Sequence, residues 1–100
     1  MYRLVRTMRI KAGKAAQAYP WAKEGITLIN KKVPGHALEA NQEVYGTHLT
    51  VHWTATFTDL ADLEVWEAKL DADPEYLAWG GKRADYMIEG SLQDTLMHSI

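Results

Sequence analysis

The segment GTHLTVHWTATF, from Gly46 to Phe57, decides the fold of this chain. It is dense in β-branched and aromatic residues, which favour an extended backbone. Apolar and polar residues alternate along it, as they do in a strand with one buried face. We therefore predict a strand over residues 47–57. Its apolar face would carry Leu49, Val51, Trp53, Ala55 and Phe57, and its polar face would carry His48, Thr50, His52, Thr54 and Thr56.

This strand prediction changes what the two histidines of the segment can do. On a helix, His48 and His52 would lie one above the other, close enough to share a metal ion. In a strand, the same four-residue separation spans roughly 13 Å, whereas metal–nitrogen bonds are only about 2.1 Å long. The zincin pattern H-E-x-x-H is also absent, because Leu49 follows His48. We therefore predict that this pair binds no metal.

On the N-terminal side of the segment, the spacing of apolar residues predicts a strand, a helix and a second strand. Residues 2–11 alternate between apolar and polar positions, which predicts a half-buried strand. Residues 15–33 carry an apolar residue every third or fourth position, which predicts a helix. Pro20 should lie in the first turn of this helix or mark a kink, because proline breaks a hydrogen bond of the helix interior. Residues 36–44 read as a weak, polar strand.

On the C-terminal side, signals for helix starts come first. Thr58 or Asp59 is expected to cap a second helix, and Asp73 to cap a further one that begins at Pro74. Residues 91–100 alternate again and predict a last strand. The resulting order is β-α-β-β-α-β. It predicts an α+β, ferredoxin-like arrangement, in which an antiparallel sheet has both helices on one face.

Length and composition bound the class of protein. A chain of 100 residues is predicted to form a single domain, residues 1–100. With a net charge of -2, the chain has no excess of positive charge that would attract nucleic acid or an anionic membrane, so we expect neither partner. The absence of cysteine excludes disulfides and thiolate catalysis. No run approaches the ~18 apolar residues that span a bilayer, and we expect a cytoplasmic protein.

Three stretches of the chain resemble a known family. They are VRTMRIKAGK, FTDLADLEVWEAKLDADPEYLAW and SLQDTLMHSI, which begin at Val5, Phe57 and Ser91. Together they resemble the dimeric α/β-barrel superfamily, and within it the NIPSNAP-like and antibiotic-biosynthesis-monooxygenase-like branches. The resemblance implies a homodimer whose two sheets pack face to face, with a cavity between the sheets or between each sheet and its helices. Some relatives are cofactor-free monooxygenases, haem-degrading enzymes or isomerases, and many others have no assigned activity.

His52 is the candidate catalytic residue, because it lies in the middle of the strand where a cavity would be deepest. It could act as a general base, bind a substrate by a hydrogen bond, or ligate haem iron. The alternative is a structural histidine at the dimer interface. His48, Thr50 and Thr54, on the same predicted face, are candidate ligand-binding residues.

Arg6, Trp53 and Trp79 are further candidate ligand-binding residues. Arg6 interrupts the apolar face of the first strand, where it could orient a carboxylate ligand or form an ion pair with an acidic residue such as Asp94. Trp53 is expected in the core or in the wall of an aromatic pocket. Trp79 precedes two glycines, so it could act as a lid residue or simply mark the end of a helix.

We therefore expect a homodimer that binds a small organic molecule. Its enzymatic form would be a cofactor-independent monooxygenase or isomerase. The alternative is a non-enzymatic ligand-binding or stress-related dimer with structural histidines. No cofactor and no metal are expected, with haem as the one cofactor alternative.

Overall fold

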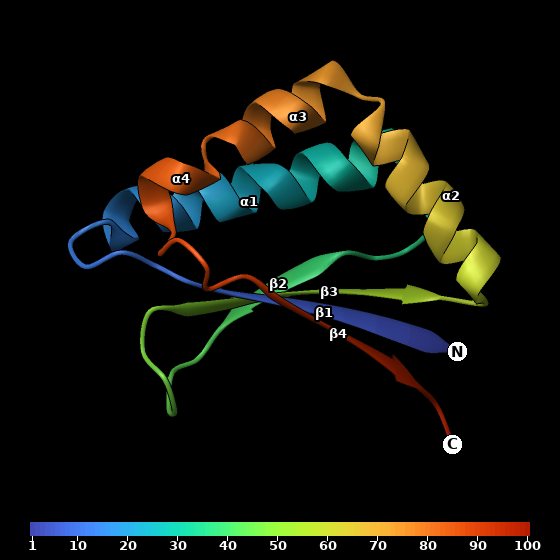
Figure 1. Ribbon diagram of the computed structural model, residues 1–100, viewed down its shortest axis with the longest axis horizontal. Coiled ribbons are helices and arrows are strands. Elements are labelled where there is room, and N and C mark those ends of the chain that lie inside the picture. The colour runs from blue at the N-terminus through green and yellow to red at the C-terminus, as the bar shows by residue number, and fades with distance from the viewer.

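The computed structural model describes residues 1–100 and arranges one sheet beneath a layer of helices (Figure 1). The sheet order is β2-β3-β1-β4, and every neighbouring pair of strands is antiparallel. No helix is long and apolar enough to cross a membrane. The elements, in chain order, are β1 (Tyr2–Arg9), α1 (Ala15–Lys32), β2 (Glu39–Gln42), β3 (Thr50–Phe57), α2 (Leu60–Asp71), α3 (Pro74–Gly81), α4 (Arg83–Tyr86) and β4 (Gln93–His98).

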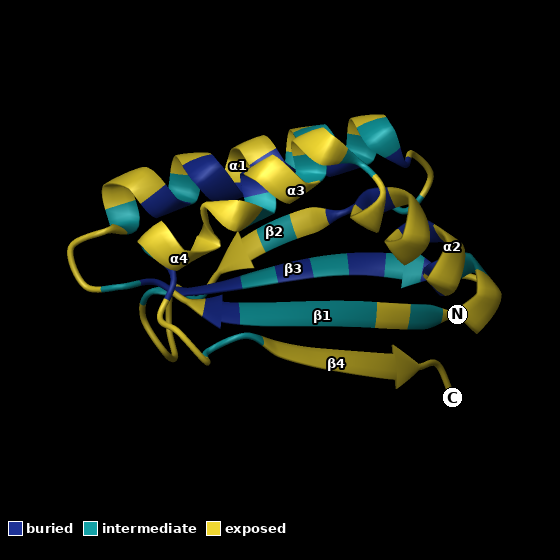
Figure 2. Cartoon of the chain, turned by 45° about the horizontal axis from the view of Figure 1, so that its top comes forward, coloured by how far each residue is buried: buried dark blue, intermediate teal, exposed yellow.

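The sheet has an inner face, covered by the helices, and an outer face without such cover (Figures 1 and 2). Cross-strand partners share a face, so Arg6 lies beside Trp53 and Asp94 on the inner face. Thr7 lies beside His52 on the outer face. The inner positions of β3 are buried and join the helices in one core, as the alternating pattern predicted; they are Val51, Trp53, Ala55 and Phe57.

The prediction that the strand begins at Thr47 is wrong, because β3 begins at Thr50. Leu49 has φ of 60°, a left-handed conformation that L-residues rarely adopt and that ends the extended backbone. His48 is exposed in the turn before it and does not belong to the polar face of the strand. The alternating pattern missed this boundary because it responds to side-chain polarity, whereas the turn depends on the backbone.

The helix caps predicted at Asp59 and Asp73 are confirmed. Asp59 caps α2 by accepting a 2.8 Å hydrogen bond from the amide of Asp62, and Asp73 caps α3 by accepting one of 3.0 Å from Tyr76. Pro20, however, lies in the second turn of α1 rather than the first. Its position on the exposed side of the helix lets water pair with the carbonyl that a proline leaves free.

Two tryptophans, Trp21 of α1 and Trp79 of α3, join these helices in what we call the tryptophan clasp. Their rings stack at 4.5 Å between centroids, with an interplanar angle of 11°. The indole N–H of Trp21 donates to the carbonyl of Trp79 at 2.9 Å, and the indole N–H of Trp79 donates to the carbonyl of Trp21 at 2.8 Å. A side chain at Gly25 would overlap the Trp79 ring, so the glycine is what lets the ring lie against α1.

We predict that Gly25→Ala destabilises the protein by about 2 kcal/mol, because the added methyl group must displace Trp79 from the clasp. Urea unfolding would measure this change, and near-UV circular dichroism would report the loss of the stacked pair. Gly80→Ala is the matched control, since no atom lies within 4 Å of an added Cβ there. It should be neutral or stabilise by about 0.5–1 kcal/mol. Equal stability of Gly25→Ala and the unsubstituted protein would contradict the role of the clasp.

Candidate functional site

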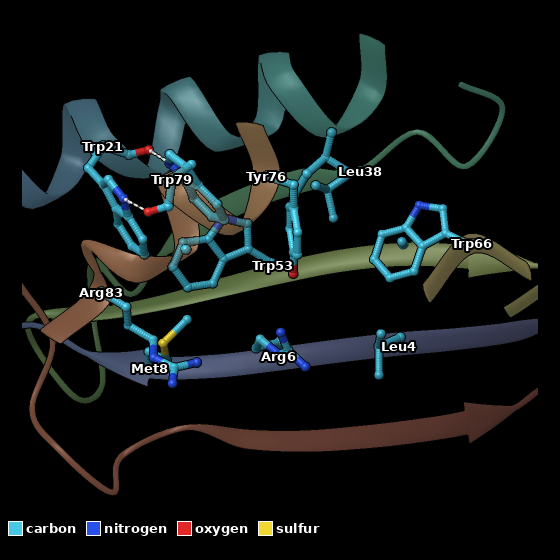
Figure 3. A pocket seen from close by; sticks show the side chains of 13 residues that line it. Leu4, Arg6, Met8, Trp21, Leu38, Trp53, Trp66, Tyr76, Trp79 and Arg83 are labelled. Carbon is cyan, nitrogen blue, oxygen red and sulfur yellow. Dashed lines mark hydrogen bonds between the residues drawn. The ribbon is translucent and has the colours of Figure 1, made fainter. Parts of the chain in front are cut away.

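A cavity of about 70 Å³ lies between the inner face of the sheet and the helices (Figure 3). One water molecule needs about 10–15 Å³ by the same measure, so the space holds more than isolated water. All four tryptophans of the chain contribute to its wall, and ten of its thirteen lining residues are hydrophobic. The lining residues are Leu4, Arg6, Met8, Trp21, Ile29, Leu38, Trp53, Ala55, Trp66, Tyr76, Trp79, Gly80 and Arg83.

The two arginines lie at one end and in the middle of this wall (Figure 3). Trp66 of α2 stands at one end, and Arg83 reaches toward the sheet from α4 at the other. Tyr76 extends from α3 toward the sheet between them, near Trp53. The helices leave β4 uncovered, and Leu4 and Arg6 on β1 are only half-buried (Figure 2). The floor of the cavity is therefore nearest to solvent along β1.

Arg6 is held in the cavity floor by Asp94. Its Nε donates to Oδ1 of Asp94 at 2.8 Å and its Nη2 donates to Oδ2 at 2.9 Å, a bidentate pair. These hydrogen bonds, and then the charge of Asp94, raise the pKa of Arg6 against the lowering effect of desolvation; the hydroxyl of Tyr76 adds a smaller effect in the same direction. The hydrogen bonds from Arg6 likewise lower the pKa of Asp94. The predicted ion pair is confirmed.

The candidate ligand-binding residues separate onto two sides of the sheet. Arg6, Trp53 and Trp79 line the cavity together. Thr54 and the candidate catalytic His52 are half-buried on the outer face, on the opposite side of the sheet from the cavity. The other two candidates, Thr50 and His48, are respectively buried at the start of β3 and exposed in the turn before it.

Ten of the thirteen lining residues were not among the candidate site residues, and Trp21 and Arg83 belong to these ten. Trp21 falls within the helix predicted over residues 15–33, and its contact with Trp79 joins residues 58 positions apart. Arg83 is separated from the glycine pair of α3 by Lys82 and begins α4. Nothing in the local sequence indicates that Arg83, rather than Lys82, lines the cavity.

His52 forms a hydrogen-bonded cluster on the outer face with Thr7 and Glu43, which we call the outer-face cluster. Nδ1 of His52 lies 2.8 Å from Oγ1 of Thr7, and Nε2 lies 2.9 Å from Oε2 of Glu43. Because an ionised carboxylate only accepts, Nε2 must carry a proton, and in neutral His52 the hydroxyl of Thr7 donates to Nδ1. The hydrogen bond from His52, followed by one from the amide of Thr47, lowers the pKa of Glu43.

The outer-face cluster orients His52 and makes Nδ1 its basic atom. A carboxylate that holds one imidazole nitrogen while the other faces a hydroxyl is an arrangement that can move a proton. Both ring nitrogens are occupied, so ligation of haem iron by His52 would require one hydrogen bond to break. No group of three or more His, Asp or Glu side chains is placed to hold a metal ion.

Solved structures with the same architecture cover nearly the whole chain. A NIPSNAP domain protein from Burkholderia xenovorans superimposes with a TM-score of 0.84 at 20% identity, over 100% of this chain and 95% of that one. A NIPSNAP family protein of unknown function from Agrobacterium tumefaciens gives 0.81 at 24% identity, over 97% and 86%. An antibiotic biosynthesis monooxygenase-like protein from Nitrosomonas europaea gives 0.77 at 15% identity, over 100% and 99%.

The chain therefore has the α+β, ferredoxin-like fold of NIPSNAP and antibiotic-biosynthesis-monooxygenase-like proteins. The resemblance noted in the sequence is confirmed at the level of the fold. No protein-family model and no curated protein matches the sequence. The structural neighbours include proteins without an assigned activity, and a shared fold does not carry a shared reaction.

The Arg6–Asp94 pair leads us to predict how the carboxyl group of Asp94 titrates in acid. The carboxyl group of Asp94 should titrate below the ordinary value of about 3.9, because its ionised form accepts two hydrogen bonds from Arg6. Since the pKa is lower in the folded state, the stabilisation is complete above the unfolded value and is lost as the pH falls through the folded one. Carbon-detected NMR of the side-chain carboxyl would measure the midpoint.

Arg6→Gln should return the Asp94 midpoint toward its ordinary value. Arg3→Gln is the matched control, because Arg3 is exposed on the opposite face of β1. A midpoint of Asp94 that responds equally to both substitutions would show that general surface charge, not the bidentate pair, lowers it.

Proposed function

We propose that this protein binds a small, planar organic molecule in the cavity between the sheet and the helices. The observation that carries the proposal is the aromatic wall, to which every tryptophan of the chain contributes. Ligand sites are concave and mostly apolar, with a few polar groups that fix orientation. Here Arg6, Arg83 and Tyr76 are those polar groups.

The shape of the wall favours a flat ligand. The ring of Trp21 stacks on that of Trp79 and meets that of Trp53 edge-on, with centroids 5.9 Å apart and an interplanar angle of 84°. These three rings pack against one another and form one aromatic part of the wall, and Trp66 adds a further aromatic face at the other end. A planar ring system in the cavity gains offset-stacked or edge-to-face contacts with such side chains, which are worth about 0.5–1.5 kcal/mol each beyond simple burial.

Binding does not require catalysis, and the enzymatic form remains the second candidate. The name of the Nitrosomonas europaea neighbour supports a monooxygenase, which we expect to be cofactor-independent. The outer-face cluster supports a proton-transfer role for His52, as an isomerase would also need. In that form the substrate would contact the outer face, not the cavity within one protomer. In the non-enzymatic form the cluster would serve only to hold β1, β3 and the turn after β2 together.

Ligand binding can be tested with the tryptophans as reporters. Planar bicyclic compounds, beginning with 2-naphthoate and its uncharged analogue 2-naphthamide, should quench tryptophan emission and raise Tm, because binding to the folded state stabilises it. Ala55→Leu should abolish both effects, since Ala55 lines the cavity and the larger side chain fills it. Ala61→Leu, on the exposed surface of α2, should leave them intact.

The binding proposal fails if neither compound binds, or if Ala55→Leu binds as well as Ala61→Leu. Proton NMR of the His52 ring distinguishes binding in the cavity from binding on the outer face of the sheet. A ligand that shifts the His52 resonances while leaving tryptophan emission unchanged would support a substrate site on the outer face instead.

We also propose that the protein forms a homodimer through the outer face of the sheet. Threonine is the commonest residue of this face, which includes Thr7, Thr54, Thr56 and Thr95; its charged members are Arg3 and Arg9 of β1 and Glu39 of β2. Its apolar members are Val5, which is half-buried, and Met97, which is 46% exposed. Burial of this face would add stability that a chain of this length lacks by itself. A cytoplasmic location stays a prediction from the sequence.

Thr54→Lys should convert the dimer to a monomer, because two-fold symmetry would bring two added cations into one desolvated interface. Size-exclusion chromatography with light scattering would report the mass. Glu64→Lys, on the exposed side of α2, is the control for the change of charge and should stay dimeric. A monomeric unsubstituted protein would refute the dimer directly.

A further inference from the structure

We propose that the ligand of the cavity is an anion: a planar organic acid whose carboxylate, or a comparably acidic oxygen group, binds Arg6 and Arg83 while its ring contacts the tryptophans. This inference rests on the proposed function and names the chemical class that the same site would select.

The cavity wall carries positive charge and no negative charge. Arg6 and Arg83 are the only ionised groups among its thirteen residues, and the wall is otherwise mostly hydrophobic. Asp94 neutralises Arg6 from the adjacent strand. The Arg83 side chain has no hydrogen bond and no carboxylate within 4.0 Å; Glu89 lines the neighbouring hollow with it but forms no ion pair. One positive charge therefore remains uncompensated in the wall.

Arg6 has hydrogen-bond donors left for a ligand. A guanidinium group has five N–H donors, and Asp94 takes only two of them. The side chain of Arg6 is still 34% exposed and borders the cavity, so the other donors are available to a ligand. Asp94 already holds the side chain in one conformation, which reduces the entropy that an incoming carboxylate must overcome.

Arg83 lies near the end of β1. Both Arg83 and Met8 line the cavity and the neighbouring hollow, so the arginine reaches from α4 to the end of β1. Figure 3 shows its guanidinium beside Met8, at the opposite end of the cavity from Trp66 and Leu38. The backbones of Arg6 and Met8, two residues apart on one face of β1, are about 7 Å apart. The two arginines therefore border the same part of the cavity floor, and we expect the acidic group of the ligand to bind there.

The rest of the cavity wall indicates where the ring of the ligand would bind. The end that contains Trp66 and Leu38 has no charged residue, so it favours the ring rather than the acid (Figure 3). The hydroxyl of Tyr76, between the two ends, can add a hydrogen bond. Charge-assisted hydrogen bonds strengthen in a water-poor cavity, and an uncharged analogue cannot form them. A planar acid should bind more tightly than its amide of the same shape.

The experiment compares 2-naphthoate with 2-naphthamide by tryptophan fluorescence titration. In the unsubstituted protein, we expect the acid to bind about tenfold or more tightly than the amide. Arg83→Gln should weaken naphthoate about tenfold and change naphthamide less than about twofold. Lys82→Gln is the matched control, because this neighbouring cation is exposed, as Arg83 is, but does not line the cavity, and it should change neither affinity.

A second variant tests the inference independently in case Arg83→Gln does not fold. The double substitution Arg6→Gln with Asp94→Asn removes both charges of the bidentate pair while keeping groups that can hydrogen-bond to each other. It should also weaken naphthoate about tenfold and spare naphthamide. Agreement between the two variants would support recognition of the acid by both arginines.

The contrary outcomes are distinct from one another. If naphthamide binds as tightly as naphthoate, the anion inference is wrong and the proposed ligand cavity stands. If Lys82→Gln weakens naphthoate as much as Arg83→Gln does, general surface charge accounts for the binding and the inference is again wrong. If neither compound binds, the proposed function fails and this inference fails with it.

Discussion

The tryptophan clasp is the interaction on which the rest of the inner side of the protein depends. Trp79 is the only buried residue of α3, so its ring and the two hydrogen bonds between indole N–H groups and carbonyls are the buried contacts that hold this helix against α1. At the surface, Lys32 of α1 adds ion pairs with Asp73 and Glu75. The clasp forms the roof of the cavity, and it fixes the helix from which Tyr76 reaches toward the sheet. Gly25 permits it, because any larger residue there would occupy the position of the Trp79 ring.

Opposite the clasp, the cavity floor contains the charge of Arg6. The alternating pattern of β1 predicts an apolar residue at this position. An unpaired cation in an apolar layer is costly, and a half-buried one still favours a partner. Asp94 is that partner, from the neighbouring strand, with both oxygens engaged. An apolar side chain would serve packing alone equally well. The proposed role of Arg6 in recognition would account for the retained ion pair.

The two faces of the sheet divide the residues that the sequence placed together as candidates for one site. Alternation predicted correctly that Trp53 and His52 lie on opposite faces of β3, because consecutive side chains of a strand point in opposite directions. It also predicted the Arg6–Asp94 pair. It could not predict that Glu43, in the turn after β2, reaches His52, or that Leu49 adopts a left-handed backbone. Both depend on how a turn closes, which polarity patterns do not encode.

The sequence by itself determined the order of the elements, the caps at Asp59 and Asp73, and the two-sided character of β3. These are local properties, set by backbone propensity and by side chains within about one turn or one strand. Only the tertiary structure decided that Trp21, Trp79, Arg6 and Arg83 surround one cavity. Their meeting depends on how helices pack on a sheet across long separations in the chain, and that packing is governed by shape and volume, which residue periodicity does not contain.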